Sequence, residues 1–328
     1  MNVRSGYHKK LVTIGGGTGS YVVLSGLKSY PIEISAIIGM FDDGGSTGVL
    51  RKELNVLPPG DVRQCLVALS EPDHALRELF EYRFYEGFLS GHSLGNIILS
   101  ALEKNTGSIS AAIDIMSELM NISHNVIPVT LQETTLCAFM NDGEQIIGQD
   151  NINRSILINR LFKLELVPDV EINAQAQKAI RDADKIVINP GNLYTSIIPN
   201  FLVKGMKEAL LQSQAKLIYV ANLMTINGHT DNLSVLDHLK LLTGYIYPKK
   251  IDYVIYNSAV PDEGLFNVYN TYNQHLVELG DHSLESRIGF VGEDLIDRKI
   301  YEKKRGDTLQ RSFIRHNADK LATILFEL

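Results

Sequence analysis

Short runs of consecutive apolar residues recur along this chain, and each run ends at a loop rich in glycine or polar residues. The runs cover residues 11–14, 34–41, 185–188, 217–220, 253–256 and 288–291. Because they are continuous and do not alternate with polar residues, they are typical of strands buried on both faces of a parallel sheet. We therefore predict a strand at each run.

Helical periodicity appears between these runs. One apolar stripe, behind a potential N-cap at Ser93, consists of Leu94, Ile97, Ile98, Ala101 and Leu102. A second helix is indicated by Val62, Cys65, Leu66 and Leu69, and a third by Ile197, Phe201, Met206 and Leu210. Strands that alternate with helices predict an α/β fold with a doubly wound, mainly parallel, Rossmann-like sheet.

One segment departs from this alternation. Short apolar runs at residues 126–130, 136–140 and 146–147 predict strands, and Asn141-Asp142-Gly143 is typical of a hairpin turn. We interpret residues from about 126 to 158 as a small β-rich insertion. A length of 328 residues fits two domains or one large one. We favour a single nucleotide-binding domain over residues 1–328.

Composition narrows the class of protein. Hydrophobic residues make up 45% of the chain and charged residues 21%, which is ordinary for a globular protein. The net charge of −7 argues against a general nucleic-acid binder but leaves room for a local basic pocket. The two cysteines, Cys65 and Cys137, lack the spacing of a zinc site. We see no targeting signal or membrane span, so we expect a cytoplasmic protein.

The first glycine-rich loop follows the first predicted strand and includes Gly16, Gly17, Thr18 and Gly19. Without side chains in the way, the backbone N–H groups of such a loop can approach an anion, and the following helix adds its N-terminal donors. Ser20 replaces the last glycine of the dinucleotide fingerprint, and no Gly-Lys-Ser/Thr closes a P-loop. We predict contact with a ligand phosphate; the alternative is a tight strand-to-helix turn.

Two adjacent carboxylates, Asp42 and Asp43, end the second predicted strand. Adjacent carboxylates repel each other unless they are solvated or bind ligand hydroxyls or a metal ion. An acid at this position binds ribose in dinucleotide folds. Gly45 and its neighbours suit a second anion nest. We predict that this loop binds ligand; the alternative is a solvated turn.

Further polar loops precede predicted helices. Asp61 lies at a helix start, where it either caps the helix or lines a site, and Arg63 either reaches a phosphate or pairs with a surface acid. Asn96 lies off its helix's apolar stripe. Residues 189–196, with Gly191, Asn192 and Thr195, form another strand-to-helix loop, and Asn222 follows the fourth strand. Loops at the carboxyl ends of parallel strands share one edge of the sheet, where ligands of such folds bind.

No catalytic residue can be assigned from the sequence. There is no GxSxG nucleophile elbow, and His92, His229 and His316 are scattered without a Ser/His/Asp order.

Together these motifs resemble the CofD/YvcK family over nearly the whole chain. The residues that carry the resemblance are IGGGTGS at 14–20, DDGGSTG at 42–48, LPPGDVR at 57–63, GHSLGN at 91–96, PGNLYTS at 190–196, and NLMT at 222–225 followed by Thr230-Asp231. One branch of the family transfers a phospholactyl group from a guanylated donor to a deazaflavin precursor with a divalent metal. The other, the bacterial gluconeogenesis-factor branch, binds a UDP-sugar and supports cell shape on gluconeogenic carbon sources.

This sequence resembles the second branch more closely, through Tyr82-Arg83-Phe84, GHSLGN, the β-rich insertion and Arg315-His316. The resemblance implies a nucleotide loop of Gly16, Gly17, Thr18 and Gly19, and a ribose or metal contact at Asp42. It further implies a site lined by Asp61, Arg63 and Asn96. The distal part of the ligand would lie at Asn192 and Thr195, and a diphosphate at Arg315.

The sequence departs from the family pattern at three positions. Asn192 stands where serine is usual, His229 where glutamate is usual, and Asn317 where aspartate is common. These departures weaken the case for a catalytic loop around His229.

We therefore expect a UDP-sugar-binding regulatory protein that binds its ligand without turnover. The alternatives are a metal-dependent transferase with a nucleotide-activated donor and an NAD-binding oxidoreductase. We expect no required cofactor, with Mg²⁺ possible at Asp42 and NAD or GDP as alternative ligands. We also expect a homo-oligomer, such as a dimer, and no nucleic-acid partner.

Overall fold

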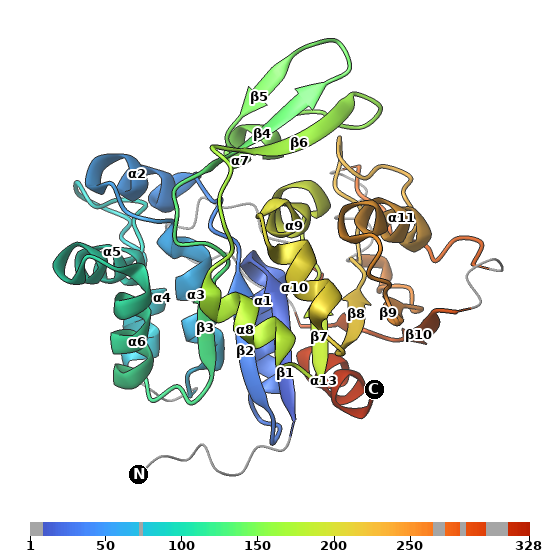
Figure 1. The fold of residues 1–328 in the computed structure, drawn as a ribbon, viewed down its shortest axis with the longest axis horizontal. Helices are drawn as coiled ribbons and strands as arrows, with labels where there is room; N and C mark the ends of the chain where they lie inside the picture. The colour runs from blue at the N-terminus through green and yellow to red at the C-terminus, as the bar shows by residue number, and fades with distance from the viewer. Residues whose placement is uncertain (1–8, 72–74, 265–272, 283–286, 300–313) are drawn as a thin grey trace.

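Seven parallel strands form the central sheet, in the order β10-β9-β8-β7-β1-β2-β3 (Figure 1). The computed structural model describes residues 9–71, 75–264, 273–282, 287–299 and 314–328. The strands are β1 (Lys10–Gly15), β2 (Glu33–Ile38), β3 (Asn125–Pro128), β7 (Lys185–Ile188), β8 (Lys216–Val220), β9 (Tyr253–Asn257) and β10 (Gly289–Glu293). The doubly wound parallel sheet that the apolar runs predict is confirmed.

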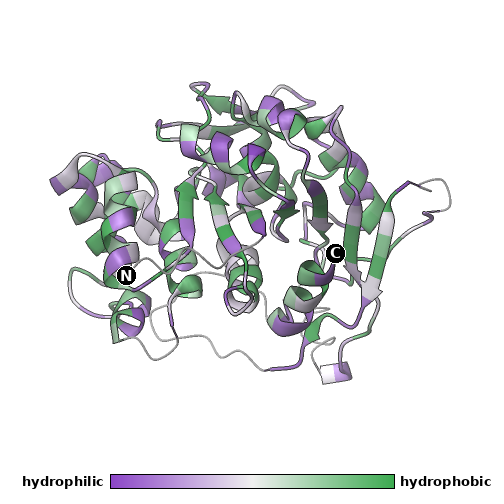
Figure 2. Cartoon of the chain, turned by 60° about the horizontal axis from the view of Figure 1, so that its bottom comes forward, coloured by the Kyte–Doolittle hydropathy of each residue, from purple (hydrophilic) through white to green (hydrophobic). Residues whose placement is uncertain are grey.

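Apolar side chains explain why these segments form the inner strands. Every residue of β7 is buried, and in β1 and β2 only the first residue is not. Apolar residues are prominent in the sheet and in the helices that cover it (Figure 2). Burial on both faces removes the polar alternation that a one-sided sheet would show.

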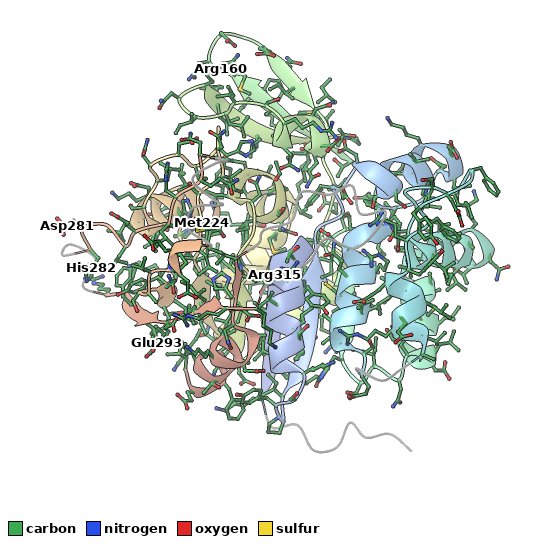
Figure 3. The ribbon with its side chains drawn as sticks, turned by 180° about the vertical axis from the view of Figure 1, so that it is seen from behind. Arg160, Met224, Asp281, His282, Glu293 and Arg315 are labelled. Atoms are coloured by element: carbon green, nitrogen blue, oxygen red, sulfur yellow. The ribbon has the colours of Figure 1, made fainter. Side chains whose placement is uncertain are left out.

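Helices cover both faces of the sheet. Seen from behind, α1 and α3 lie in front of the strands, and α1 packs against both α3 and α13 (Figure 3). On the opposite face α10 packs against α8 and α9, and α9 packs against α11. The helices are α1 (Gly17–Leu27), α2 (Gly45–Leu54), α3 (Pro59–Leu69), α4 (Ala75–Glu81), α5 (Leu94–Thr106), α6 (Ile109–Leu119), α7 (Gln149–Asn153), α8 (Ala174–Arg181), α9 (Ile198–Leu202), α10 (Met206–Gln212), α11 (Val235–Ile246) and α13 (Ala318–Glu327). In the described part of the chain, no helix is long and apolar enough to cross a membrane.

The β-rich insertion has different bounds from those predicted. Residues 125–128 are β3, which pairs in parallel with β2 at the edge of the central sheet. The small separate sheet consists of β4 (Thr135–Met140), β5 (Gln145–Ile147) and β6 (Leu161–Val167), all antiparallel. The prediction of about 126–158 therefore began too early and ended too soon. The run at 126–130 was assigned to the wrong sheet because an apolar run does not specify its partner strand.

Two helix predictions also need correction. The single helix expected from Ile197 to Leu210 is a π-helix, η2 (Leu193–Ile197), followed by α9 and α10, which are separated at Gly205 with its φ of +89°. In α5 the predicted apolar stripe is only partly buried, and the fully buried face carries Gly95, Asn96, Leu99 and Ser100. Polar partners on neighbouring elements, described below, make burial of that face favourable.

The strand order places a topological switch point between β1 and β7. From β1 the chain continues to β2 on one side, whereas β7 and its successors lie on the other. In open α/β sheets, ligands bind in the crevice outside the carboxyl ends of the strands at this point. The loops that follow β1 and β7, both of which contain glycine, therefore flank this crevice.

Candidate functional site

The loops after β1 and β7 touch at the switch point. Helix α1 begins at Gly17, behind an N-cap, Gly16, whose lack of a side chain leaves the helix uncapped. A Cβ on Gly19 would lie only 1.7 Å from the carbonyl oxygen of Pro190, so a side chain there would force the loops apart. Asn189 strengthens the contact by donating from Nδ2 to Ser20 Oγ over 2.9 Å. The N-terminus of α1, which its own N-cap glycine leaves without a side-chain cap, therefore lies where the two loops meet, and such a helix end can bind an anion.

Asp61 lies in the first turn of α3 against the same glycine loop. A Cβ on Gly16 would come within 2.1 Å of Asp61 Oδ2, and the Gly17 N–H donates a hydrogen bond to the Asp61 carboxylate. The sequence left open whether Asp61 merely caps its helix. In the structure its carboxylate instead accepts a backbone donor of the neighbouring α1 loop.

The carboxyl groups of Asp42 and Asp61 lie close enough for the charge of one to act on the other. Burial, and then the charge of Asp42, raises the pKa of Asp61 to about 7. Burial also raises the pKa of Asp42, although the Gly44 N–H and the Thr47 hydroxyl donate hydrogen bonds to it. The site therefore disfavours two negative charges in the free protein and favours either a proton or a cation between them.

The residues present fit a Mg²⁺ ion held together with a ligand phosphate. Mg²⁺ usually keeps several waters and uses one or two carboxylates plus substrate phosphates. Asp42 and Asp61 would supply the two carboxylates. Across the described residues, no cluster of three or more His, Cys, Asp or Glu side chains forms a closed metal cage. The positive charge of Arg63 lowers the pKa of Asp61, so Arg63 offsets part of the negative charge of this carboxyl pair.

A small cavity of about 30 Å³ lies beside Asp42, at the N-terminus of α2. The N-cap residue of α2, like that of α1, is a glycine without a side chain that could cap the helix. The cavity is lined by Asp42, Gly44, Gly45, Ser46, Thr47, Gly60, Arg63, Gln64, Arg83 and Asn96. The structure thus brings together Asp42, Gly45, Arg63 and Asn96, which the sequence placed in one site, from three helices and a loop.

A chain of hydrogen bonds orients the side chains on the Arg63 and Asn96 side of this cavity. Arg63 Nε donates to Asn96 Oδ1 over 2.9 Å, and Asn96 Nδ2 donates to Ser46 Oγ over 3.3 Å. The Ser93 N–H also donates to Ser46 Oγ, so both acceptor positions of that hydroxyl are filled. Its own proton must then go to His92 Nδ1, 3.1 Å away, which places the His92 proton on Nε2. His92 is therefore oriented by a hydroxyl and not by a carboxylate.

Asp43 has a different role from Asp42. Its carboxylate accepts hydrogen bonds from the Gln149 N–H at 3.1 Å and the Asp150 N–H at 2.7 Å. These are the first N–H groups of α7, so Asp43 caps the helix of the β-rich insertion. Of the two adjacent acids, Asp43 therefore binds the insertion helix α7, whereas Asp42 binds the Gly44 N–H at the start of α2.

The Gly191–Thr195 loop is held from two sides. The Asn222 carboxamide donates to the Gly191 carbonyl at 2.8 Å and accepts from the Gly191 N–H at 2.9 Å. Asn192 Oδ1 accepts from the Tyr194 N–H and so caps η2. Asn192 Nδ2 lies 3.0 Å from Asn153 Oδ1 and 3.2 Å from His229 Nδ1. The side chains of Asn192 and Asn222 are therefore bonded to protein groups.

His229 is a buried, neutral link between elements. Its Nδ1 faces the Asn192 amide and its Nε2 donates to the Ser155 carbonyl at 3.1 Å. Burial lowers its pKa below the ordinary value. With both ring nitrogens occupied, His229 is not arranged as a general base.

Arg315 lies in β12 (Arg315–His316), which pairs with β11 (Ile296–Asp297) opposite Asp297 (Figure 3). Its neighbour His316 contacts the Ala221 carbonyl through Nε2 at 3.0 Å, at the end of β8. Arg315 is thus positioned near the carboxyl end of β8, but it does not line the cavity beside Asp42.

Sequence reasoning missed several residues of this region. Gln64 and Arg83 line the cavity but were not among the predicted ligand residues. Asn153 and Gln149 bond to the η2 segment from the insertion. Gln64 could have been suspected from its place one residue after Arg63, whereas the contacts of Asn153 span about 40 positions and leave no local signal.

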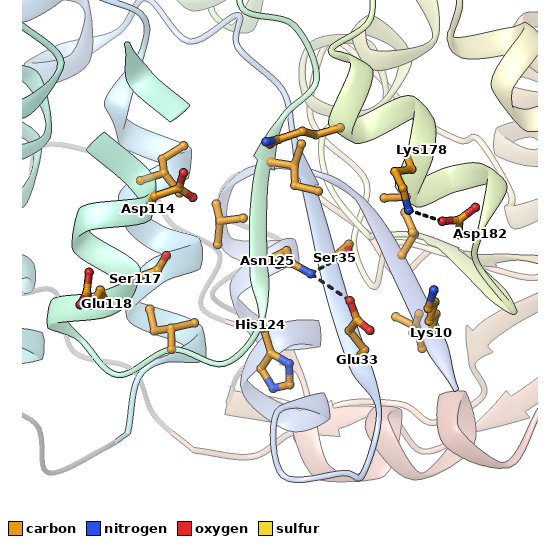
Figure 4. Close-up of a pocket in the computed structure, with 18 residues that line it drawn as sticks. Lys10, Glu33, Ser35, Asp114, Ser117, Glu118, His124, Asn125, Lys178 and Asp182 are labelled. Carbon is orange, nitrogen blue, oxygen red and sulfur yellow. Dashed lines mark hydrogen bonds and ion pairs between the residues drawn. The ribbon is translucent and has the colours of Figure 1, made fainter. Parts of the chain in front are cut away.

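A larger cavity of about 550 Å³ lies elsewhere, on the face of the sheet between α6 and α8 (Figure 4). It is lined by the amino-terminal halves of β1 and β2, and its polar side chains largely bond to one another. Asn125 donates to Glu33 and Ser35, and Lys178 pairs with Asp182 at 2.6 Å. Size alone would favour this cavity. The glycine N-caps of α1 and α2 and the carboxyl pair of Asp42 and Asp61 lie instead at the carboxyl edge of the sheet, which we take as the candidate site.

Comparison with known proteins identifies the family of this chain and supports its fold. Residues 11–295 match the family model described as 2-phospho-L-lactate transferase CofD. The chain is 36% identical over 326 residues to the gluconeogenesis factor of Bacillus subtilis, covering 98% of this chain and 99% of that protein. It is 38% identical over 323 residues to the gluconeogenesis factor of Halalkalibacterium halodurans, covering 97% and 96%.

A solved structure shows the same architecture. The crystal structure of a UPF0052 family protein from Bacillus halodurans has a TM-score of 0.88 with this chain at 36% identity, covering 97% of this chain and 98% of that one. The protein therefore belongs to the CofD/YvcK family, in its gluconeogenesis-factor branch.

Proposed function

We propose that this protein is a nucleotide-sugar-binding regulatory protein that binds a UDP-sugar at the switch-point crevice and leaves it intact. Its relatives are named gluconeogenesis factors, and by that relationship we extend the proposal to support of cell shape and growth on gluconeogenic carbon sources. The ligand phosphates would lie over the glycine loop of Gly16, Gly17, Thr18 and Gly19. Asp42 would contact the ribose or a metal ion, and the sugar would extend toward Asn192 and Thr195.

One observation carries the proposal: helices α1 and α2 both begin behind an N-cap glycine that has no side chain to cap them, α1 beside Asp61 and α2 beside Asp42. Each helix end presents first-turn N–H donors to an anion, although Asp61 already accepts the Gly17 N–H of α1. Arg63 adds a fixed positive charge to the lining of the cavity beside Asp42.

The Asp61 carboxylate imposes a condition on phosphate binding. It already accepts the Gly17 N–H that an incoming phosphate would use. A phosphate beside an ionised Asp61 would be repelled, so binding requires either a proton on Asp61 or a divalent cation that bridges the carboxylates and the phosphate. We therefore propose that Mg²⁺ strengthens binding above neutral pH, although it is not required below it.

A second function, a transferase using a nucleotide-activated donor, is favoured by the same pair of acids. A carboxyl group with a pKa of about 7 is suited to general acid–base catalysis, and the matching family model is that of a transferase. We rank it second because His229 has both ring nitrogens engaged and His92 is oriented by Ser46. Within the described residues, neither histidine is paired with a carboxylate that would activate it.

The experiment that tests the proposal is a thermal-shift screen of purified protein with UDP-sugars, GDP and NAD, with and without MgCl₂. A ligand at about 100 times its dissociation constant stabilises the folded state by about 2.7 kcal/mol, which is readily detected. Stabilisation by UDP-sugars alone supports the proposal, whereas a shift with GDP or NAD only would reject it. Incubation with a guanylated lactyl donor, a deazaflavin acceptor and Mg²⁺, followed by chromatography, distinguishes the transferase. Release of a nucleoside monophosphate over multiple turnovers would establish that alternative.

A further inference from the structure

Helix α7 of the β-rich insertion lies against the loops of the candidate site, not apart from them. Its first N–H groups are capped by Asp43, from the loop after β2. Beyond its last residue, the N–H groups of Leu157 and Ile158 donate to the Gly228 carbonyl, in the loop after β8. The Ser155 carbonyl also lies 3.1 Å from His229 Nε2. The helix is thus fixed at both ends by loops from the carboxyl edge of the central sheet.

One face of α7 contacts the η2 segment. Gln149 and Asn153 are four residues apart and so project from the same face of the helix. Gln149 Nε2 donates to the Thr195 carbonyl at 3.4 Å, and Asn153 Oδ1 accepts from the Thr195 hydroxyl at 2.7 Å. The same Asn153 oxygen lies 3.0 Å from Asn192 Nδ2.

The donors and acceptors in this cluster leave each amide one orientation. Asn192 Oδ1 accepts from the Tyr194 N–H, so its Nδ2 must supply both remaining bonds, to Asn153 Oδ1 and His229 Nδ1. Asn153 Oδ1 in turn receives two donors. A single acceptor atom from the insertion therefore fixes the side chains of both Asn192 and Thr195.

We propose that Asn153 is a positioning residue that makes the insertion part of the ligand site, by holding in place the segment from Asn192 to Thr195, beside which the sugar end of the nucleotide sugar binds. This inference rests on the proposed function for the identity of the ligand. Asn153 itself is exposed at the surface and acts through its two partners. The insertion then contributes to discrimination between the sugar portions of ligands, whereas the glycine loop holds the portion that all UDP-sugars share.

The first test compares binding of UDP-glucose and of UDP by calorimetry. Asn153→Ala removes the shared acceptor, and we expect about tenfold weaker binding of UDP-glucose with less than about a twofold change for UDP. Asn153→Asp keeps an acceptor oxygen and should restore most of the UDP-glucose affinity. Asn151→Ala is the matched control, since Asn151 lies on the same helix but donates to the Ile147 carbonyl. Equal weakening of both ligands by Asn153→Ala would overturn the proposal.

A second measurement needs no ligand and separates this inference from the proposed function. Amide hydrogen exchange of residues 193–198 should be about tenfold faster in Asn153→Ala than in the unmodified protein, and unchanged in Asn151→Ala. Unchanged exchange in Asn153→Ala would refute the positioning role. If the unmodified protein binds no UDP-sugar while exchange still responds to Asn153, the proposed ligand is wrong and the positioning role stands.

Discussion

The Asp42–Asp61 pair predicts that one substitution in the candidate site stabilises the ligand-free protein. Asp61→Asn keeps the size of the side chain but removes the charge that burial and Asp42 disfavour. The pKa of Asp61 is about 7, against an ordinary value of 3.8. Since each pH unit corresponds to about 1.4 kcal/mol, the ionised group costs the folded state up to about 4 kcal/mol. Water reaching the crevice reduces this cost, and we expect a gain of about 2 kcal/mol for the variant at pH 8.

The sign follows from proton binding. Between pH 4 and pH 7 the folded protein holds a proton on Asp61 that the unfolded chain has lost, because the folded pKa is the higher one. The free energy of unfolding therefore falls as the pH rises through this range and levels off above it. Asp61→Asn removes this contribution, so the variant and the unmodified protein should differ little at pH 4 and most at pH 8.

The assay is chemical denaturation or thermal unfolding measured at pH values from 4 to 8 without divalent cations. A gain of about 2 kcal/mol corresponds to a rise in melting temperature of about 3 °C at pH 8 for a protein of this size. Asp114→Asn, an exposed acid on α6, is the control and should follow the unmodified protein. MgCl₂ at pH 8 should reduce the difference in unfolding free energy between Asp61→Asn and the unmodified protein, because it stabilises only the protein that has both carboxylates. If the free energy of unfolding depended on pH in the same way for Asp61→Asn and the unmodified protein, the reasoning would be refuted.

Other substitutions test individual loops. Gly17→Val adds a side chain in open space but at a φ of +61°, so the fold should survive with a loss of about 1–2 kcal/mol in stability. Stabilisation by ligand should disappear in this variant. A normal ligand-induced shift in melting temperature would show that the loop is only a turn. Gly19→Ala places Cβ against the Pro190 carbonyl and should destabilise the protein by more than about 2 kcal/mol in urea unfolding, so an unchanged midpoint would contradict the packing of the two loops. Asp42→Asn should weaken ligand or Mg²⁺ binding in calorimetry more than Asp43→Asn, because Asp43 caps α7 instead; equal and negligible effects would remove Asp42 from the site.

Much of the fold could be predicted from the chain because its signals are local. A continuous apolar run such as residues 185–188 predicts a buried strand without knowledge of its neighbours, and the polar residues after it predict where the strand ends. Since all the strands of the sheet are parallel, those loops meet at one edge. Asp42 and Gly45 consequently lie at that edge, and Arg63 and Asn96 line the same cavity from α3 and α5.

The errors arose where tertiary partners decide the outcome. Residues 126–128 have the composition of any apolar strand, and only pairing with β2 places them in the central sheet. Helix α5 buries Asn96 because Arg63 and Ser46 supply its hydrogen bonds, which an apolar stripe cannot reveal. The contact of Asn153 with Asn192 likewise depends on how the insertion docks.

Isothermal titration calorimetry with UDP-glucose and related UDP-sugars, at pH 8 with MgCl₂, tests the central claim most directly. The account predicts one binding event per chain with the unmodified protein, a marked loss of affinity with Gly17→Val and with Asp42→Asn, and full recovery of intact ligand afterwards. Absence of binding by every UDP-sugar at millimolar concentration, in protein that binds GDP or NAD at the same crevice, would contradict it.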